Sequence, residues 1–175
     1  MILKKFSSFI LYKEELARMK YWIEVASGDW AWTKKIVENS IKKRGLKAPA
    51  QTRYINMLSP VMPRDCLLTY LTTSLTENKN WRSSIVGISI ISSDCYKIGY
   101  SIFIDTSDDT ELPAPIKFQD FSTLGIFSQK FQTMISRNFQ KYLFEIEKDD
   151  FVTLCKLKID NYNFLMKTQY KNYLD

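Results

Sequence analysis

The sequence predicts an α+β fold built around a curved mixed sheet or open barrel, with helices at its edges. Strand-like and helix-like segments alternate too irregularly for a doubly wound sheet, and the centre of the chain is rich in strand patterns. With 175 residues, 45% of them apolar and 14% aromatic, the chain can bury one sizeable core. We expect an N-terminal helical extension over 1–19, a main domain over 20–158 and a C-terminal tail over 159–175.

The first third of the chain predicts a helix, a strand and a second helix. Residues 6–19 carry large apolar side chains at helical spacing, and residues 20–26 form a compact apolar strand. A Ser-Gly-Asp turn then leads into a basic helix over 29–44, which ends at a glycine. Glycine and prolines predict an irregular connection over 45–63.

The remaining elements follow β-branched runs and turn residues. Strands are predicted at 66–71, 84–91, 100–104 and 141–146, and helices at 128–138 and 147–157. The acidic segment 105–111 lacks the glycine and the terminal glutamate of a calcium-binding loop, so we expect a solvated hairpin loop there. The residues from 160 to 175 form either an amphipathic helix or a disordered segment.

Composition limits the chemistry of this protein. The absence of histidine excludes Ser-His-Asp and Cys-His nucleophile systems and removes the commonest zinc ligand. Because paired carboxylates and a phosphate-binding glycine loop are missing as well, we expect no enzyme, no metal and no cofactor. The three cysteines, Cys66, Cys95 and Cys155, lie far apart and predict reduced thiols. No apolar run reaches membrane-spanning length and no cleavable leader is evident, so a cytoplasmic location is expected.

Positive charge is concentrated near the N-terminus. Residues 1–60 contain 12 Lys or Arg and 5 Asp or Glu, a net +7, whereas residues 61–175 contain 13 and 14, a net −1. A basic region that also carries tryptophans is typical of a protein that binds a phosphate backbone. A lysine-rich solvated surface gives the same charge pattern, so charge alone leaves both interpretations open.

Five short motifs occur in an order that resembles the EVE domains, relatives of the YTH and PUA-like pseudobarrel folds. They are Lys20–Ser27, Lys47–Pro49, Met62–Tyr70, Ile85–Ile88 and Ile146–Phe151. Together they extend over roughly residues 20–158. The resemblance implies a PUA-like pseudobarrel that reads a modified, typically methylated, base in DNA or RNA. Domains of this kind hold the flipped base in an aromatic pocket, and some serve as recognition modules of methylation-dependent restriction enzymes.

The resemblance assigns the base pocket to the first strand, its turn and the 92–100 segment. Ser27 and Asp29 would contact the polar edge of the base, and Trp30 would lie near the floor or the wall of the pocket. The remaining candidates are Trp22, Tyr96 and Tyr100. Other roles stay open: tryptophans usually fill cores, an aspartate at this turn is a helix N-cap, and strand alternation places only part of the 96–100 aromatics inside.

Five cations are candidates for contacts with phosphate groups. Two lie on the basic helix, one on the loop after it, one before the 84–91 strand and one after the 128–138 helix: Lys35, Lys43, Lys47, Arg82 and Arg137. For each of them the alternative interpretation is an ordinary surface cation that contacts no ligand.

A second function remains open from the sequence alone, that of a structural or protein-interaction subunit. In that case the N-terminal helix and the tyrosine-rich tail would form a homodimer or dock a partner. Trp32, an aromatic on the cationic face of the basic helix, would then be buried under residues 6–19 or in a subunit interface.

Overall fold

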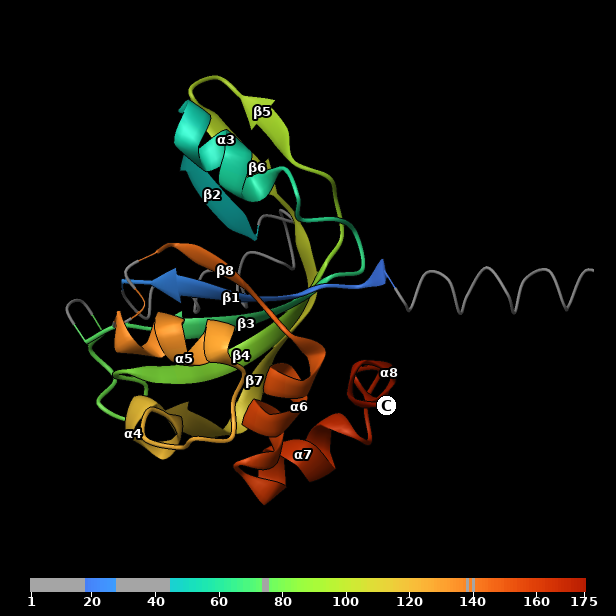
Figure 1. The fold of residues 1–175 in the computed structure, drawn as a ribbon. Coiled ribbons are helices and arrows are strands. Elements are labelled where there is room, and N and C mark those ends of the chain that lie inside the picture. Colours follow the sequence, from blue (N-terminus) through green and yellow to red (C-terminus); the bar gives the residue numbers. More distant parts are fainter. Residues whose placement is uncertain (1–17, 28–44, 74–75, 138, 140) are drawn as a thin grey trace, which may run out of the picture.

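The computed structural model describes residues 18–27, 45–73, 76–137, 139 and 141–175. Figure 1 shows a main sheet in the centre. A small sheet and one helix lie above this main sheet, and a group of helices lies at the opposite end. The helix expected over 29–44 lies outside the described residues, as does all but the end of the helix expected over 6–19.

The main sheet has five strands in the order β7-β4-β3-β1-β8. β1 and β3 run parallel, and the other neighbouring pairs are antiparallel. The strands are β1 (Tyr21–Ala26), β3 (Cys66–Leu71), β4 (Ser84–Ile91), β7 (Thr106–Lys117) and β8 (Leu143–Ile146). The first three strands predicted for the main domain are confirmed, because their apolar and β-branched side chains are buried on both faces of a central sheet.

The small sheet is antiparallel and consists of β2 (Leu46–Pro49), β6 (Ser101–Ile104) and β5 (Tyr96–Ile98). Residues 45–63, expected to be irregular, contain β2 and the helix α3 (Thr52–Leu58). In β2, Leu46 and Ala48 are buried while Lys47 and Pro49 are exposed, a period-two pattern too short to stand out in the sequence. β6 continues into β7 after one residue, so a single bent strand path joins the two sheets without closing a barrel.

The acidic segment 105–111 is not the solvated hairpin loop that we expected. Most of it is the first half of β7, which pairs with β4 so that Thr106 lies opposite Ile91. The Ser89 and Thr106 hydroxyls both donate to the Asp109 carboxylate. Pairing with a neighbouring strand therefore outweighs the low strand propensity of acidic residues.

Buried apolar clusters lie on both faces of the main sheet, as side-chain alternation along β1 requires, and a small third cluster contains Ala26, Leu71 and Val86. Tyr21 and Ile23 belong to the main core, whereas Trp22 belongs to a second core shared with the small sheet. The helices α4 (Phe118–Phe121), α5 (Gln129–Ser136), α6 (Lys148–Lys156), α7 (Ile159–Leu165) and α8 (Lys171–Leu174) all contribute to the main core. Helices expected at 128–138 and 147–157 are thereby confirmed as α5 and α6.

The residues from 159 onward form two short helices, α7 and α8, joined by turns over 166–170, which is closer to the helical alternative than to the disordered one. They are also part of the main core. Tyr170 is 1% exposed and its hydroxyl lies 3.2 Å from the Ile88 carbonyl and 2.5 Å from the Asp108 carbonyl. Tyr173 donates to the Arg64 carbonyl at 3.0 Å. These hydroxyls connect the end of the chain to the main sheet.

Asn161 fixes α7 to β7 through a paired hydrogen bond. Its side chain accepts from the Ala114 N–H at 2.8 Å and donates to the Ala114 carbonyl at 2.7 Å. Ala114 stands between Pro113 and Pro115, which have no N–H of their own. The fully buried amide thus completes the hydrogen bonding of a strand segment that cannot form a regular ladder.

We expect the buried tyrosines to make the fold sensitive to alkali. Burial raises the pKa of Tyr21 to about 12, and it raises the pKa of Tyr170 and Tyr173 as well. In the unfolded chain these hydroxyls ionise near pH 10, so their stabilising effect is complete below about pH 10. Above it, the free energy of unfolding should fall by up to about 1.4 kcal/mol per pH unit for each tyrosine.

This prediction is checked by urea denaturation at a series of pH values from about 8 to about 11.5. The free energy of unfolding should begin to fall near pH 9, because burial also raises the pKa of the Cys66 and Cys155 thiols, and it should decline more steeply above about pH 10. A level profile across the whole range would contradict the buried hydroxyls.

Candidate functional site

The candidate site lies where the main sheet meets the small sheet. On β1 and β3 the side chains that point away from helices α4–α8 are Trp22, Glu24, Ala26, Leu67, Thr69 and Leu71, and all of them are buried. We call this set the junction face. Parallel pairing places Glu24 opposite Thr69 at its centre, with Trp22 opposite Leu67 at one end. Polar groups therefore occupy the middle of an otherwise apolar surface.

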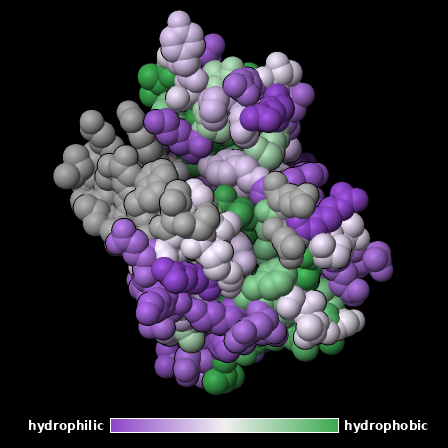
Figure 2. All heavy atoms as spheres, turned by 90° about the vertical axis from the view of Figure 1, so that its left-hand side faces the viewer, coloured by the Kyte–Doolittle hydropathy of each residue, from purple (hydrophilic) through white to green (hydrophobic). Residues whose placement is uncertain are grey.

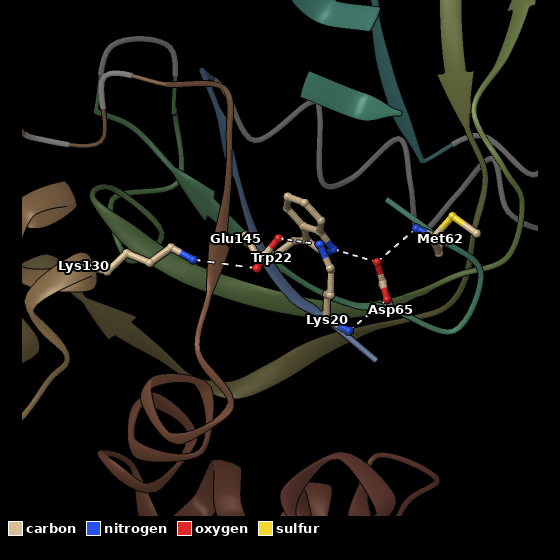
Figure 3. A network of polar contacts seen from close by, with 6 residues as sticks. All are labelled: Lys20, Trp22, Met62, Asp65, Lys130 and Glu145. Atoms are coloured by element: carbon tan, nitrogen blue, oxygen red, sulfur yellow. Dashed lines mark hydrogen bonds and ion pairs between the residues drawn. The ribbon is translucent and has the colours of Figure 1, made fainter. Parts of the chain in front are cut away.

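Trp22 is held in place by a buried carboxylate at the start of β3 (Figure 3). Its indole N–H donates to Asp65 at 2.8 Å, and Asp65 also accepts from the backbone N–H groups of Lys20 at 2.9 Å and Met62 at 3.0 Å. Burial raises the pKa of Asp65, and the three donors act in the opposite direction. The polar atom of Trp22 is thus engaged within the protein, and the ring is 4% exposed.

Lys20 links this arrangement to β8. Its Nζ lies 2.8 Å from the Glu145 carboxylate and 5.7 Å from the centre of the Trp22 ring, and Lys130 approaches the same carboxylate at 3.7 Å. These ion pairs are partly exposed, so their contribution to stability is small, about 0–1 kcal/mol each.

Glu24 forms a second polar cluster, which connects the two sheets. The Tyr142 hydroxyl lies 3.2 Å from the Glu24 carboxylate and 3.3 Å from the Lys47 carbonyl, and it accepts from the Lys47 N–H at 3.3 Å. Thr69 donates to the other carboxylate oxygen at 3.4 Å. Burial and the nearby carboxylate raise the pKa of Tyr142 well above its usual value, so its hydroxyl stays protonated.

Sequence reasoning missed Glu24, Thr69 and Tyr142. One signal was available, because Glu24 is the one charged residue in the strand Tyr21–Ala26. A carboxylate at the centre of an apolar strand requires polar partners from neighbouring strands.

Lys47 and Tyr96 share one face of the small sheet, on either side of Phe103. The register pairs Lys47 with Phe103 and Phe103 with Tyr96. The Lys47 Nζ lies 5.7 Å from the Phe103 ring centre, and the Tyr96 ring stacks on Phe103 at 5.8 Å. The Tyr96 hydroxyl donates to Asp105 at 2.7 Å. Lys47 is exposed, so its charge can meet a ligand while its stem packs on an aromatic ring.

The other predicted residues lie apart from one another. Ser27 is exposed just after β1, and Tyr100 is 95% exposed at the turn between β5 and β6. Arg82 donates through Nε to the Thr76 carbonyl at 2.7 Å, before β4, and Arg137 is exposed at the end of α5. Asp29, Trp30, Lys35 and Lys43, like Trp32, lie outside the described residues.

Two further properties bear on the class of protein. Among the described residues, no group of three or more His, Cys, Asp or Glu side chains is placed to hold a metal ion. In the same part of the chain, no helix has both the length and the apolar character that crossing a bilayer requires. Figure 2 shows hydrophilic residues spread over both the upper lobe and the body below it, with apolar residues exposed between the two as well as on the lobe and at the lower edge.

No family model matches the sequence, and neither does any curated protein. Solved structures are similar in fold. The chain aligns with protein Atu2648 from Agrobacterium tumefaciens at 11% identity and a TM-score of 0.55, and with Rpa0253 from Rhodopseudomonas palustris at 16% identity and a TM-score of 0.54. Each alignment covers 79% of this chain and 92% of the other.

A third similar structure is the YTH domain of the MRB1 protein from Zygosaccharomyces rouxii, in complex with N6-methyladenosine RNA. Its TM-score is 0.51 at 9% identity, and the alignment covers 79% of this chain and 86% of that domain. The protein therefore has an α+β fold of the PUA-like pseudobarrel type, similar to that of this YTH domain, and within the described residues its two sheets do not close into a barrel.

Proposed function

We propose that the protein is a nucleic-acid-binding module that recognises a modified base, and that within its fold class it is an EVE-type domain. The observation that carries this proposal is the fold shared with a YTH domain that is in complex with N6-methyladenosine RNA. The alignment covers 79% of this chain, so the similarity is not confined to one motif. A methylated base is accordingly the ligand that we expect.

The described residues support a binding surface at the small sheet. Residues 45–62 and 96–104 contain Lys47, Arg53 and Lys97 and no acidic residue, a net +3. All three cations are exposed. Phosphate groups attract such a surface, and the released counterions make binding dependent on salt. We place the base close to the turn that follows β1, with Ser27, Asp29 and Trp30 as its contacts, and Lys47 beside the adjoining phosphates.

Binding is tested with two oligonucleotides that differ only in N6-methyladenine against adenine, each prepared as RNA and as DNA. Fluorescence anisotropy gives the Kd at a series of salt concentrations. We expect the methylated strand to bind more tightly. For three phosphate contacts on a single strand, the affinity should fall by roughly 20-fold between 50 and 200 mM salt. Binding that is indifferent to both salt and methylation would overturn the proposal.

Lys47→Gln is the matched variant for the phosphate contact. It should weaken binding to methylated and unmethylated strands by the same factor and reduce the salt slope by about 0.7. Lys167→Gln removes an exposed lysine after α7, far from the small sheet, and should leave both quantities unchanged. If both variants weakened binding equally, affinity would depend on the net charge of the protein and not on the position of Lys47.

A further inference from the structure

The turn between β5 and β6 exposes an aromatic ring almost completely. Tyr100 is 95% exposed, more than any other large apolar side chain among the described residues, and Ile98 next to it is 51% exposed. In Figure 1 this hairpin forms part of the small lobe at the end of the molecule farthest from α7. An exposed flat ring gains most from a partner that also offers a flat face.

The backbone that carries this ring is well fixed. Ile98 pairs with Ser101, which leaves a two-residue turn of Gly99 and Tyr100. Gly99 has a φ of 57°, the left-handed conformation that such tight turns need. The Tyr100 carbonyl accepts from the Ala50 N–H at 2.9 Å, which ties the turn to the segment between β2 and α3. Presenting the ring from a fixed turn lowers the entropy lost on binding.

Cations flank this turn, and one of them is already oriented. Lys97 is exposed within β5, and Arg53 lies on the first turn of α3, close in the chain to Ala50. The Arg53 guanidinium stacks on the Tyr54 ring at 4.5 Å and donates to the Tyr54 hydroxyl at 2.8 Å. A guanidinium has five N–H groups in one plane, so after the hydrogen bond to Tyr54 the other N–H groups of Arg53 remain available to a phosphate.

We propose that this hairpin tip is a second nucleic-acid contact, separate from the base pocket. Tyr100 stacks on an unpaired base beside the modified one, while Lys97 and Arg53 hold the neighbouring phosphates. The inference rests on the proposed function, since it requires a strand that is already bound near the small sheet. The local charge favours a polyanion over a protein partner, because residues 45–62 and 96–104 hold three exposed cations against two flanking acids, Asp94 and Asp105, and Asp105 accepts a hydrogen bond from Tyr96.

Tyr100→Ala tests the stacking contact on a single-stranded RNA of about ten nucleotides with one N6-methyladenine. The affinity should fall by roughly 5- to 150-fold, the range that alanine substitution of a stacking aromatic gives. The loss should be the same for the unmethylated strand, so the preference for methylation is kept. Tyr100→Phe retains the ring and should bind as the unaltered protein does. Ile126→Ala removes a side chain that is 64% exposed elsewhere on the surface and should have no effect.

A second readout reports stacking directly. 2-Aminopurine placed beside the methylated base should lose fluorescence on binding to the unaltered protein and to Tyr100→Phe, but not to Tyr100→Ala. If Tyr100→Ala matches the unaltered protein in affinity and quenching while salt and methylation dependence persist, the tip inference fails and the proposed function stands. If the unaltered protein binds neither strand, both fail. If it is a dimer that Tyr100→Ala converts to a monomer, the tip is an interface between copies and the inference is overturned.

Discussion

Replacing Asp65 with alanine is expected to lower the free energy of unfolding by about 3–5 kcal/mol, which is a large fraction of the total for a domain of this size. Asp65 is 2% exposed and accepts from the Lys20 and Met62 N–H groups and from the Trp22 indole. Alanine would leave three donors without this acceptor, and an unsatisfied buried donor costs about 1–3 kcal/mol. The partial exposure of Lys20 and the surface position of Met62 allow water to replace part of the loss.

Urea denaturation measures this effect against two controls. Asp65→Asn keeps the shape and one acceptor oxygen, so we expect a smaller decrease of about 1–2 kcal/mol. Glu77→Ala removes an exposed carboxylate and should change stability by less than about 0.5 kcal/mol. A decrease below about 1 kcal/mol for Asp65→Ala would show that the three hydrogen bonds do not hold the junction of β1 and β3 together.

Asp65 also illustrates why the contact between β1 and β3 was only partly predictable from the sequence. The sequence around it indicated a turn before a strand, and β3 begins one residue later. That this carboxylate reaches Trp22 depends on the parallel pairing of β1 with β3, which brings together residues 43 positions apart. Local patterns contain no information about such pairing. The same holds for Glu24, whose partners Thr69 and Tyr142 come from two other strand regions.

The parts of the fold that the sequence did reveal are those with strong local periodicity. β4 is dense in β-branched residues, and α6 starts with acids and has an apolar face. β2, α3, β7 and α4 were missed because glycine, prolines and aspartates hide elements that form only through contacts with the rest of the protein. Of the predicted ligand contacts, the structure brings Lys47 and Tyr96 together on the small sheet, again through strand register.

The C-terminal residues, whose structure the sequence left open, belong to the main core, and they give the second large prediction. We expect that deleting residues 169–175 abolishes cooperative folding. The deletion removes Tyr170, Tyr173 and Leu174, which are 1%, 7% and 7% exposed in the main core. Truncating one buried aromatic residue costs about 3–5 kcal/mol and one leucine about 2–5 kcal/mol. The sum is comparable with the 5–15 kcal/mol that a domain has in total.

Circular dichroism and thermal denaturation follow the outcome, and milder variants keep the test informative if the deletion does not yield soluble protein. Tyr170→Phe keeps the ring and removes the hydroxyl beside the Ile88 and Asp108 carbonyls, so it should lower stability by about 1–2 kcal/mol. Lys171→Ala with Asn172→Ala alters only exposed side chains of α8 and should have little effect. A truncated protein with an unchanged melting temperature would mean that the main core closes without its last helix. The seven residues would then be an appendage to the domain.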